Sequence, residues 1–433
     1  MPAGGGNQSA AVLAVEETFA DVVDPAPALP ARRGPRIAFG LYWAHVFALF
    51  GLGASNILLG LAVLGSPLSG KLRGLGRRAV RPLLAVAALY VLLLGVSIVF
   101  SFDPERSARG MSEVFSLCTL LLGLALLRNE RAVRLALDAI VLLAIFESLA
   151  GLVQLVAAGG PDLDHRIHGS MSHYMTFSGV LMIADVVLLG RLLAGARSGE
   201  ARGDWRRDWR LWALVPVNAA LIATLTRSAW VGLAAGIVAL LLLGRPRLLL
   251  WWVPVALLAL LLLPSSVLER AASIVDPGDL TNADRICMAQ AGWSMIRERP
   301  LVGQGPNMVE ERYPLYRLPN AWRLSIPHLH DAFLQVAAER GVPALLALLL
   351  LLGLPAARAL AAYRREGGRG GPRADLWLGV LGALVAFAVA GLFEDNWGDV
   401  EVQRLVLVLL AVPYGLVDAS ADERASDGDA ALA

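Results

Sequence analysis

The chain has 433 residues, of which 57% are hydrophobic and only 17% charged, with a formal net charge of +2. Soluble domains carry about 25% charged residues, so the composition excludes an ordinary soluble enzyme. Apolar runs long enough to cross a bilayer recur along the chain, and backbone groups in lipid must be satisfied internally. We therefore expect an all-α, polytopic membrane protein. The 2 cysteines make neither a disulfide framework nor a metal cluster.

Residues 1–35 are rich in Gly, Ala, Pro and acidic side chains, which predicts a disordered segment. No cleavage pattern follows the first apolar run, so this segment is not expected to be a cleavable signal peptide. The apolar runs follow in order at 37–64, 80–101, 110–128, 133–157, 174–195, 210–225, 228–243, 247–264, 342–361, 376–393 and 403–417.

The loops between these runs alternate in charge. Arginine and lysine gather in loops 65–81, 128–134, 196–210, 244–247 and 358–373, whereas loops 102–109, 158–173, 226–228, 265–341 and 394–402 lie between them. The positive-inside rule places the first set in the cytoplasm and the second set outside. Because both flanks of the first run are basic, residues 37–64 are expected to cross twice, with a turn near Gly51, Gly53, Ser55 and Asn56. This gives about twelve transmembrane helices, and one long tilted helix with eleven crossings is the alternative.

Five regions follow from this topology. They are a cytoplasmic N-terminus (1–35), a bundle of nine membrane helices (36–264), one large, partly helical periplasmic loop (265–341), three further membrane helices (342–418) and an acidic cytoplasmic tail (419–433). The loop 265–341 is the one long polar segment, so chemistry is expected there. Residues 284–299 predict a helix that ends at Pro300, with Ile286, Ala289, Gln290, Trp293 and Ile296 along one side. A short helix 332–340 is expected, with Asp331 as N-cap and Gly341 at its end.

His328 and His330 are the first candidate site residues. His330 precedes the predicted helix 332–340, where the helix dipole favours the neutral, proton-accepting imidazole of a general base, whereas the neighbouring Asp331 acts in the opposite direction. Two interfacial histidines bonded to loop backbone are the alternative. A metal site is a weaker interpretation, because no third and fourth ligand follow at a recognisable spacing.

Arg227 and Arg285 are candidate anion ligands. Arg227 lies between two apolar runs with almost no loop, where an arginine is costly unless it is paired or faces water. Arg285 opens the predicted helix 284–299. Guanidinium groups match phosphate oxygens bidentately. The alternatives are snorkelling to headgroups for Arg227 and a surface ion pair with Asp284 or Asp279 for Arg285.

Further cations face the same outer side in loop 158–173, namely His165, Arg166, His168 and His173. Together with the arginines they predict an electropositive outer face suited to an anionic headgroup. The acidic turn Glu394, Asp395, Asp399 and Glu401 is expected to neutralise neighbouring arginines. No Walker-type phosphate loop, dinucleotide-binding glycine motif or zinc signature is present in the sequence.

Four segments, taken in order, resemble the O-antigen ligase / O-antigen polymerase superfamily of membrane glycosyltransferases. They are R-I-H-G-S-M-S-H-Y-M-T-F-S-G (166–179), L-T-R-S-A-W-V-G (225–232), D-R-I-C-M-A-Q-A-G-W-S-M-I-R-E-R-P-L-V-G-Q-G-P (284–306) and P-H-L-H-D-A-F-L-Q-V-A-A-E-R-G-V-P (327–343). The turn F-E-D-N-W-G-D-V-E-V (393–402) is similar to one in ligase-like members.

The resemblance implies a bacterial inner-membrane enzyme that needs no metal or other cofactor. It implies transfer of a glycan from undecaprenyl diphosphate to an acceptor hydroxyl on the periplasmic side, with Arg227, Arg285 and His330 as catalytic residues. His328, Arg166, His168 and His173 are expected to bind substrate. Asp331 stands where the family usually has Asn.

The sequence leaves the acceptor open between lipid A-core (a ligase), another repeat unit (a polymerase) and a protein hydroxyl (an O-oligosaccharyltransferase). Apart from these substrates, membrane lipids are the expected partners, and nucleic acid is not expected to bind. A transporter of polysaccharide or lipid-linked sugar is the alternative from another class, but the sequence shows no internal repeat and its polar residues cluster outside the membrane.

Overall fold

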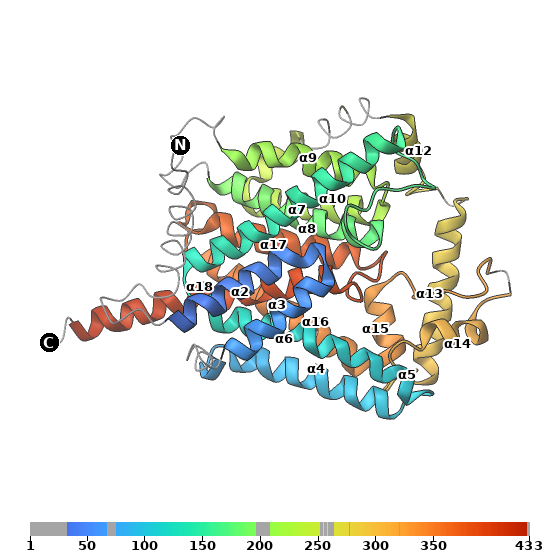
Figure 1. Ribbon diagram of the computed structural model, residues 1–433, viewed down its shortest axis with the longest axis horizontal. Coiled ribbons are helices and arrows are strands. Elements are labelled where there is room, and N and C mark those ends of the chain that lie inside the picture. The colour runs from blue at the N-terminus through green and yellow to red at the C-terminus, as the bar shows by residue number, and fades with distance from the viewer. Residues whose placement is uncertain are drawn as a thin grey trace, which may run out of the picture.

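The computed structural model describes residues 33–66, 75–195, 208–251, 254, 258, 264–276, 278–319 and 321–430, and these residues form helices and connecting loops without strands. The predictions for residues 1–32, for the middle of loops 65–81 and 196–210, and for most of the run 247–264 lie outside this described part. Figure 1 shows long helices packed side by side, with the short helices of the polar segment gathered at one end.

Nearly every predicted apolar run within the described residues corresponds to a helix. The first group is α2 (Arg33–Phe47), α3 (Leu52–Gly65), α4 (Arg81–Val99), α5 (Pro104–Ala108), α6 (Ser112–Leu126), α7 (Glu130–Ala158), α8 (Tyr174–Gly195), α9 (Trp209–Ala223) and α10 (Arg227–Gly244). The second is α12 (Ser265–Ala272), α13 (Leu280–Glu298), α14 (Val309–Tyr316), α15 (Ala332–Arg340), α16 (Val342–Arg365), α17 (Ala374–Ala390) and α18 (Val400–Ala430).

By length and composition, 6 helices in the described residues can cross a membrane: Arg81–Val99, Pro104–Leu126, Glu130–Ala158, Tyr174–Ala194, Arg227–Gly244 and Val342–Arg365. Shorter apolar helices lie at Arg36–Phe50, Leu52–Gly65, Trp209–Ala223 and Ala374–Ala390. The chain is thus a multi-pass membrane protein, and the total of about twelve crossings stays a prediction.

The first apolar run folds as the predicted helical hairpin. Helices α2 and α3 pack against each other and are joined by a single turn at Ala48–Phe50 and Gly51. His45 in α2 binds Ser55 in α3, because its Nδ1 lies 2.8 Å from the Ser55 hydroxyl. The alternative of one long tilted helix is therefore wrong for this segment.

Helix α18 occupies the centre of the bundle. It packs against α6, α7, α8, α16 and α17, and its residues from Glu401 to Leu416 are buried. A helix that is apolar on all sides is expected to be buried on all sides, and the run L-V-L-V-L-L-A-V at 405–412 has this character. The helix continues to Ala430, through most of the predicted acidic tail.

Helices α8 and α17 approach closely at two glycines. A Cβ added to Gly190 would overlap the backbone of Gly379 and Leu378. Small residues at such crossings let membrane helices pack backbone to backbone. The pair Gly190 and Gly379 therefore sets the distance between two helices of the core.

We expect Gly190→Ala to destabilise the protein by about 1–3 kcal/mol, because the added methyl group forces the two helices apart. Thermal unfolding in detergent would measure this as a lowered midpoint. Gly95→Ala is the matched control, since Gly95 also lies within a helix but a methyl group added there would meet no neighbouring atom within 4 Å. Equal midpoints for the two variants would contradict the close approach.

Within the described residues, the two sets of loops that the charge pattern distinguished lie at opposite ends of the bundle (Figure 1). At one end, Ser107 Oγ donates to Pro306 O at 2.8 Å, and the backbone N of Ala332 donates to Gly391 O at 2.8 Å. At the other end, Arg373 Nη1 donates to Leu416 O at 2.8 Å. Residues far apart in the chain thus meet at the end that holds the polar segment.

Candidate active site

Helix α13 is the longest element of the polar segment, and it starts earlier than predicted. Asp279, not Asp284, caps it, because the Asp279 side chain accepts a hydrogen bond from Asn282 N. The expected start at Asp284 is therefore wrong, and Arg285 lies in the second turn of the helix and not in the first. The helix ends at Glu298, before Pro300, as predicted.

The face of α13 that packs on α15 also differs from the predicted apolar line. The buried residues are Asp284, Cys287, Met288, Ala291, Gly292, Met295 and Ile296. Of the predicted line only Ile296 is buried, whereas Ile286 and Trp293 are 61% and 58% exposed. The apolar side chains of α13 therefore point both toward α15 and away from it.

Helix α15 and the turn before it match the prediction. Asp331 caps the helix, since its Oδ1 accepts from Phe333 N at 3.0 Å and from Leu334 N at 2.9 Å. Gly341 ends the helix with a φ of +83°. His330 has a φ of +52°, a left-handed conformation that non-glycine residues seldom adopt and that often accompanies functional sites.

Glu394 joins both candidate histidines. Its Oε2 lies 3.1 Å from His330 Nδ1, and its Oε1 lies 3.8 Å from His328 Nε2. Arg285 Nη2 is 3.8 Å from Glu394 Oε2. If His330 Nδ1 donates to Glu394, Nε2 is left as the proton acceptor of the ring. A carboxylate that orients an imidazole in this way is typical of general-base sites.

Burial and charge act on this cluster in opposite directions. Burial raises the pKa of Glu394, but the hydrogen bond from His330 and the charges of His330, His328 and Arg285 outweigh it and leave the pKa below its ordinary value. Burial lowers the pKa of His328 to about 4, although Glu394 opposes this shift. Near neutral pH, Glu394 is therefore an anion and His328 is uncharged.

Arg227 is the first residue of α10 and is buried at 4% exposure. Its Nη1 donates to Ser273 O at 2.8 Å, to Ser273 Oγ at 2.9 Å and to Asp279 Oδ1 at 3.1 Å. Its Nη2 is buried without an acceptor among the described residues, as is Nε of Arg285. Buried N–H groups without an acceptor are costly, so a bound anion would satisfy both.

Arg227, Arg285 and His330 line one cavity of about 500 Å³, which we call the arginine cavity. Its remaining lining includes the apolar side chains of Val231, Ile274, Val275, Ile286, Leu329, Leu392 and Phe393. Val275 is 83% exposed and Ile286 is 61% exposed, so part of this apolar wall is open. Cations beside open apolar surface are suited to a ligand with an anionic head and a hydrocarbon tail.

One residue of this region, Arg270, was not singled out from the sequence, and the expected role of a second, Glu394, was incomplete. Burial, followed by the positive charges of Arg227 and Arg166, lowers the pKa of Arg270 to about 10, so Arg270 in α12 belongs to the same arginine cluster. Glu394 was expected only to neutralise arginines, which it does for Arg285, and its contact with His330 was missed. The turn 393–402, which resembles that of ligase-like proteins, was the signal that could have led to it.

The loop 158–173 is fastened to α7. Gln154 Nε2 donates to Gly169 O at 2.6 Å, and Glu147 Oε2 accepts from Ser170 N at 2.9 Å. His165, Arg166, His168 and His173 line a separate cavity of about 480 Å³.

The four cations of this loop have different surroundings. His165 Nδ1 lies 3.0 Å from Asp162 Oδ2, and the His168 ring lies 2.7 Å from Met171 O. The Arg166 guanidinium lies 4.4 Å from the centre of the Tyr174 ring. Burial lowers the pKa of His173, and Glu394 opposes the shift, so His173 lies within electrostatic reach of the Glu394 cluster. His173 thus couples this loop electrostatically to the cluster around Glu394.

Asp399 lies just before α18 at the same end of the bundle. Burial, followed by the negative charges of Glu394 and Glu401, raises the pKa of Asp399 to about 7. The folded state therefore keeps this proton up to about pH 7, whereas an unfolded aspartate releases it near pH 4. The stability that the proton provides is complete below about pH 4 and is lost as the pH rises through about 7.

We therefore expect Asp399→Asn to lose less thermal stability than the wild type between about pH 5 and pH 8. Unfolding midpoints in detergent over this pH series would measure the difference. Glu311→Gln, an exposed carboxyl that faces Arg106, is the control. A parallel pH dependence for Asp399→Asn and the wild type would show that Asp399 is ionised throughout this range.

His328, His330 and Glu394 also place one ligand atom each within 4.8 Å of one another, a spacing that could hold a metal ion. Two imidazoles and one carboxylate suit several divalent ions. The same three groups contact one another directly, so their arrangement does not require an ion.

Comparison with known families finds one match within the chain. Residues 211–349 match the family model described as O-antigen ligase. The match supports the resemblance of this segment to the O-antigen ligase-like superfamily. No curated protein matches the chain. The matched segment runs from α9 into α16 and contains Arg227, Arg285 and His330. Glu394 lies outside the O-antigen ligase segment and reaches it from the loop between α17 and α18. Asp331, where this superfamily usually has Asn, serves here as the cap of α15.

Proposed function

We propose that the chain is an inner-membrane glycosyltransferase that moves a glycan from undecaprenyl diphosphate to an acceptor hydroxyl on the periplasmic side. One observation carries the proposal. The arginine cavity combines two guanidinium groups, each with a buried N–H donor that has no acceptor among the described residues, with a histidine held by a buried carboxylate, beside an open apolar wall. These are the groups needed to bind a lipid diphosphate and to deprotonate a hydroxyl.

The histidine supplies the base. Glu394 accepts a hydrogen bond from Nδ1–H of His330, which leaves Nε2 free to take the proton of the acceptor hydroxyl. The hydroxyl oxygen then forms a bond to the anomeric carbon of the donor. The bond between that carbon and the diphosphate oxygen breaks, and its electron pair leaves with the undecaprenyl diphosphate. Attack from the side opposite the leaving group inverts the configuration of the carbon.

The arginines supply the charge. Arg227 and Arg285 bind the diphosphate and stabilise the negative charge that grows on it as the bond breaks. Arg270 adds a third positive charge to the cluster. The exposed side chains of Val275, Ile286 and Leu392 leave a path for the polyprenyl tail. His173 and Arg166, on the neighbouring loop, are proposed to contact the sugars of the donor, with His328 and His168 nearby.

The proposed transfer needs no metal ion, because the positive charge comes from arginine and the base from histidine. We expect treatment of the purified protein with EDTA to leave the transfer rate unchanged. The control is a known metal-dependent glycosyltransferase assayed in the same buffer. Loss of activity that Mn²⁺ or Zn²⁺ restores would instead assign His328, His330 and Glu394 to a metal site.

We propose lipid A-core as the acceptor, on the resemblance of the turn 393–402 to that of ligase-like proteins. A deletion strain tests this assignment through its lipopolysaccharide and exported glycans. Loss of polymer attachment with accumulation of lipid-linked polymer supports a ligase. Loss of long chains alone would assign the protein as a polymerase, and loss of glycan on proteins alone would assign it as a protein O-oligosaccharyltransferase. Unchanged glycans would contradict the function itself.

A further inference from the structure

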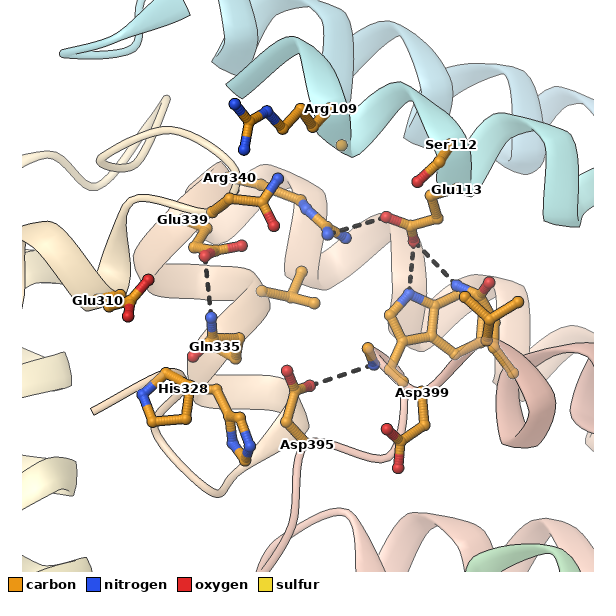
Figure 2. Close-up of a pocket in the computed structure, with 18 of the residues that line it drawn as sticks. Arg109, Ser112, Glu113, Glu310, His328, Gln335, Glu339, Arg340, Asp395 and Asp399 are labelled. Atoms are coloured by element: carbon orange, nitrogen blue, oxygen red, sulfur yellow. Dashed lines mark hydrogen bonds and ion pairs between the residues drawn. The ribbon is translucent and has the colours of Figure 1, made fainter. Parts of the chain in front are cut away.

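Whereas His330 lines the arginine cavity, a second cavity has the neighbouring His328 in its lining. It has a volume of about 550 Å³ and is lined at its inner end by His328, Gln335, Glu339 and Asp395. Arg109 and Glu310 lie at its outer rim, where both are exposed (Figure 2). Its volume is within the range of about 300–1,000 Å³ that is usual for ligand pockets. We call it the carboxylate cavity.

The two cavities share a wall built from two stretches of chain. In the first, His328 lines the carboxylate cavity and His330 lines the arginine cavity, with ring centres 4.2 Å apart. In the second, Asp395 lines the carboxylate cavity and Phe393 lines the arginine cavity. Glu394 is buried between them and contacts both histidines. The proposed base therefore stands at the boundary of two separate spaces.

The charge of the carboxylate cavity differs from that of the arginine cavity. Five carboxyl groups line it (Glu113, Glu310, Glu339, Asp395 and Asp399), against three guanidinium groups (Arg106, Arg109 and Arg340). Two of the arginines are already paired, because Arg340 lies 2.8 Å from Glu113 and Arg106 lies 2.8 Å from Glu310. The remaining groups are three carboxyls (Glu339, Asp395 and Asp399) and one guanidinium (Arg109), so the carboxylate cavity lacks the surplus of positive charge that an anion needs.

The same carboxyls are suited to hydroxyl groups. Figure 2 shows Glu339, Asp395 and Asp399 around the cavity, and Glu339 also accepts a hydrogen bond from Gln335 Nε2 at 2.9 Å. Burial is the main cause that raises the pKa of Glu339 and of Asp399 to about 7. Near neutral pH these carboxyls exist in both forms, so they can accept hydrogen bonds from hydroxyls and donate to them.

Inversion requires the attacking oxygen and the leaving oxygen to lie on opposite sides of the anomeric carbon. If the diphosphate leaves on the side of the arginine cavity, the acceptor must enter from across the shared wall. We propose that the carboxylate cavity binds the acceptor, as an uncharged, hydroxyl-rich sugar, and so selects against acceptors that carry a phosphate at the reacting residue. This inference rests on the proposed glycosyltransferase function.

Binding of separate probes to the purified full chain in nanodiscs tests this assignment. Methyl glucoside and N-acetylglucosamine probe the carboxylate cavity, glucose 6-phosphate probes its charge selectivity, and farnesyl diphosphate probes the arginine cavity. Saturation-transfer NMR detects the sugars, and calorimetry detects the diphosphate. Ser112→Trp fills the carboxylate cavity from an exposed position on its lining, and Met111→Trp adds the same side chain at the adjacent residue, which does not line it.

We expect Ser112→Trp to weaken binding of the uncharged sugars by about tenfold or more, because the indole occupies their volume, and to leave farnesyl diphosphate unaffected. Met111→Trp should bind all probes as the wild type does, and Arg227→Gln should lose only farnesyl diphosphate. Three results would each overturn the inference. Glucose 6-phosphate could bind as tightly as methyl glucoside, the uncharged sugars could bind Ser112→Trp as tightly as the wild type, or no sugar could bind up to its solubility limit. If His330→Gln abolishes transfer but Ser112→Trp leaves sugar binding unchanged, the acceptor site is refuted and the proposed function is retained.

Discussion

Replacement of His330 by glutamine is expected to lower the rate of glycan transfer by about 10²–10⁴-fold, the usual contribution of a general base. Glutamine keeps a hydrogen-bonding group near Glu394 but cannot take up a proton. The measurement is single-turnover transfer from a lipid-linked donor by purified protein, with binding of donor measured separately. Donor affinity should change little, because His330 acts on the acceptor hydroxyl.

His165→Gln is the matched control, since His165 is 82% exposed and pairs with Asp162 in the neighbouring loop. Glu394→Gln adds a second test of the same arrangement. It keeps the shape of the side chain but removes the carboxylate that holds the His330 ring through Nδ1, so transfer should fall while binding of the donor is kept. Full activity of His330→Gln at normal protein levels would refute the base assignment. Full activity of Glu394→Gln would refute its positioning role.

Replacement of Arg227 by glutamine is expected to lower transfer by about 10²–10³-fold, the loss seen when one donor to a developing anion is removed. Arg227→Lys should recover only part of the rate, because an ammonium group keeps the charge but not the forked geometry that suits a phosphate. Both variants should also bind farnesyl diphosphate more weakly, which calorimetry measures without any turnover.

Arg227 also fastens α10 to Ser273 and Asp279, so loss of that tether must be separated from loss of the anion ligand. Ser273→Ala removes the hydroxyl acceptor and leaves the guanidinium in place, and it should keep most of the activity. Arg245→Gln, at the opposite end of α10, is the control for loss of an arginine at a helix terminus. If Ser273→Ala is as impaired as Arg227→Gln, the role of Arg227 is structural.

Much of the fold could be predicted because membrane helices are encoded locally. An apolar run of sufficient length must be helical in lipid, and the hairpin of α2 and α3 followed from the basic residues on both of its flanks. The cap at Asp331 was equally local, since the residue type and the following helix are adjacent in the sequence. These features needed no knowledge of what packs against them.

The start and the buried face of α13 could not be predicted in this way. The helix was expected to begin at Asp284, but it is capped by Asp279, whose side chain also contacts Arg227 from a distant part of the chain. The apolar pattern also gave the wrong face, because Ile286 and Trp293 are as apolar as the buried residues, and only the packing of α13 on α15 distinguishes the two sides.

The contacts of Glu394 lay beyond sequence reasoning for a different reason. It is 64 residues from His330 in the chain, and no periodicity relates the two. Arg227 and Arg285 were selected as anion ligands by their positions, yet their unsatisfied nitrogens became visible only once their other neighbours were known.

The central position of α18 affects the order in which the bundle can assemble. A growing chain is made from its N-terminus, so α18 is made after every other helix that the structure describes. Helices α6, α7, α8, α16 and α17 therefore gain their shared neighbour only when α18 is in place. Glu394 precedes α18 by only a few residues, so His330 gains the carboxylate that it contacts at the same late step. A chain that ends before Glu394 would already hold Arg227, Arg285 and His330, but it would lack this contact.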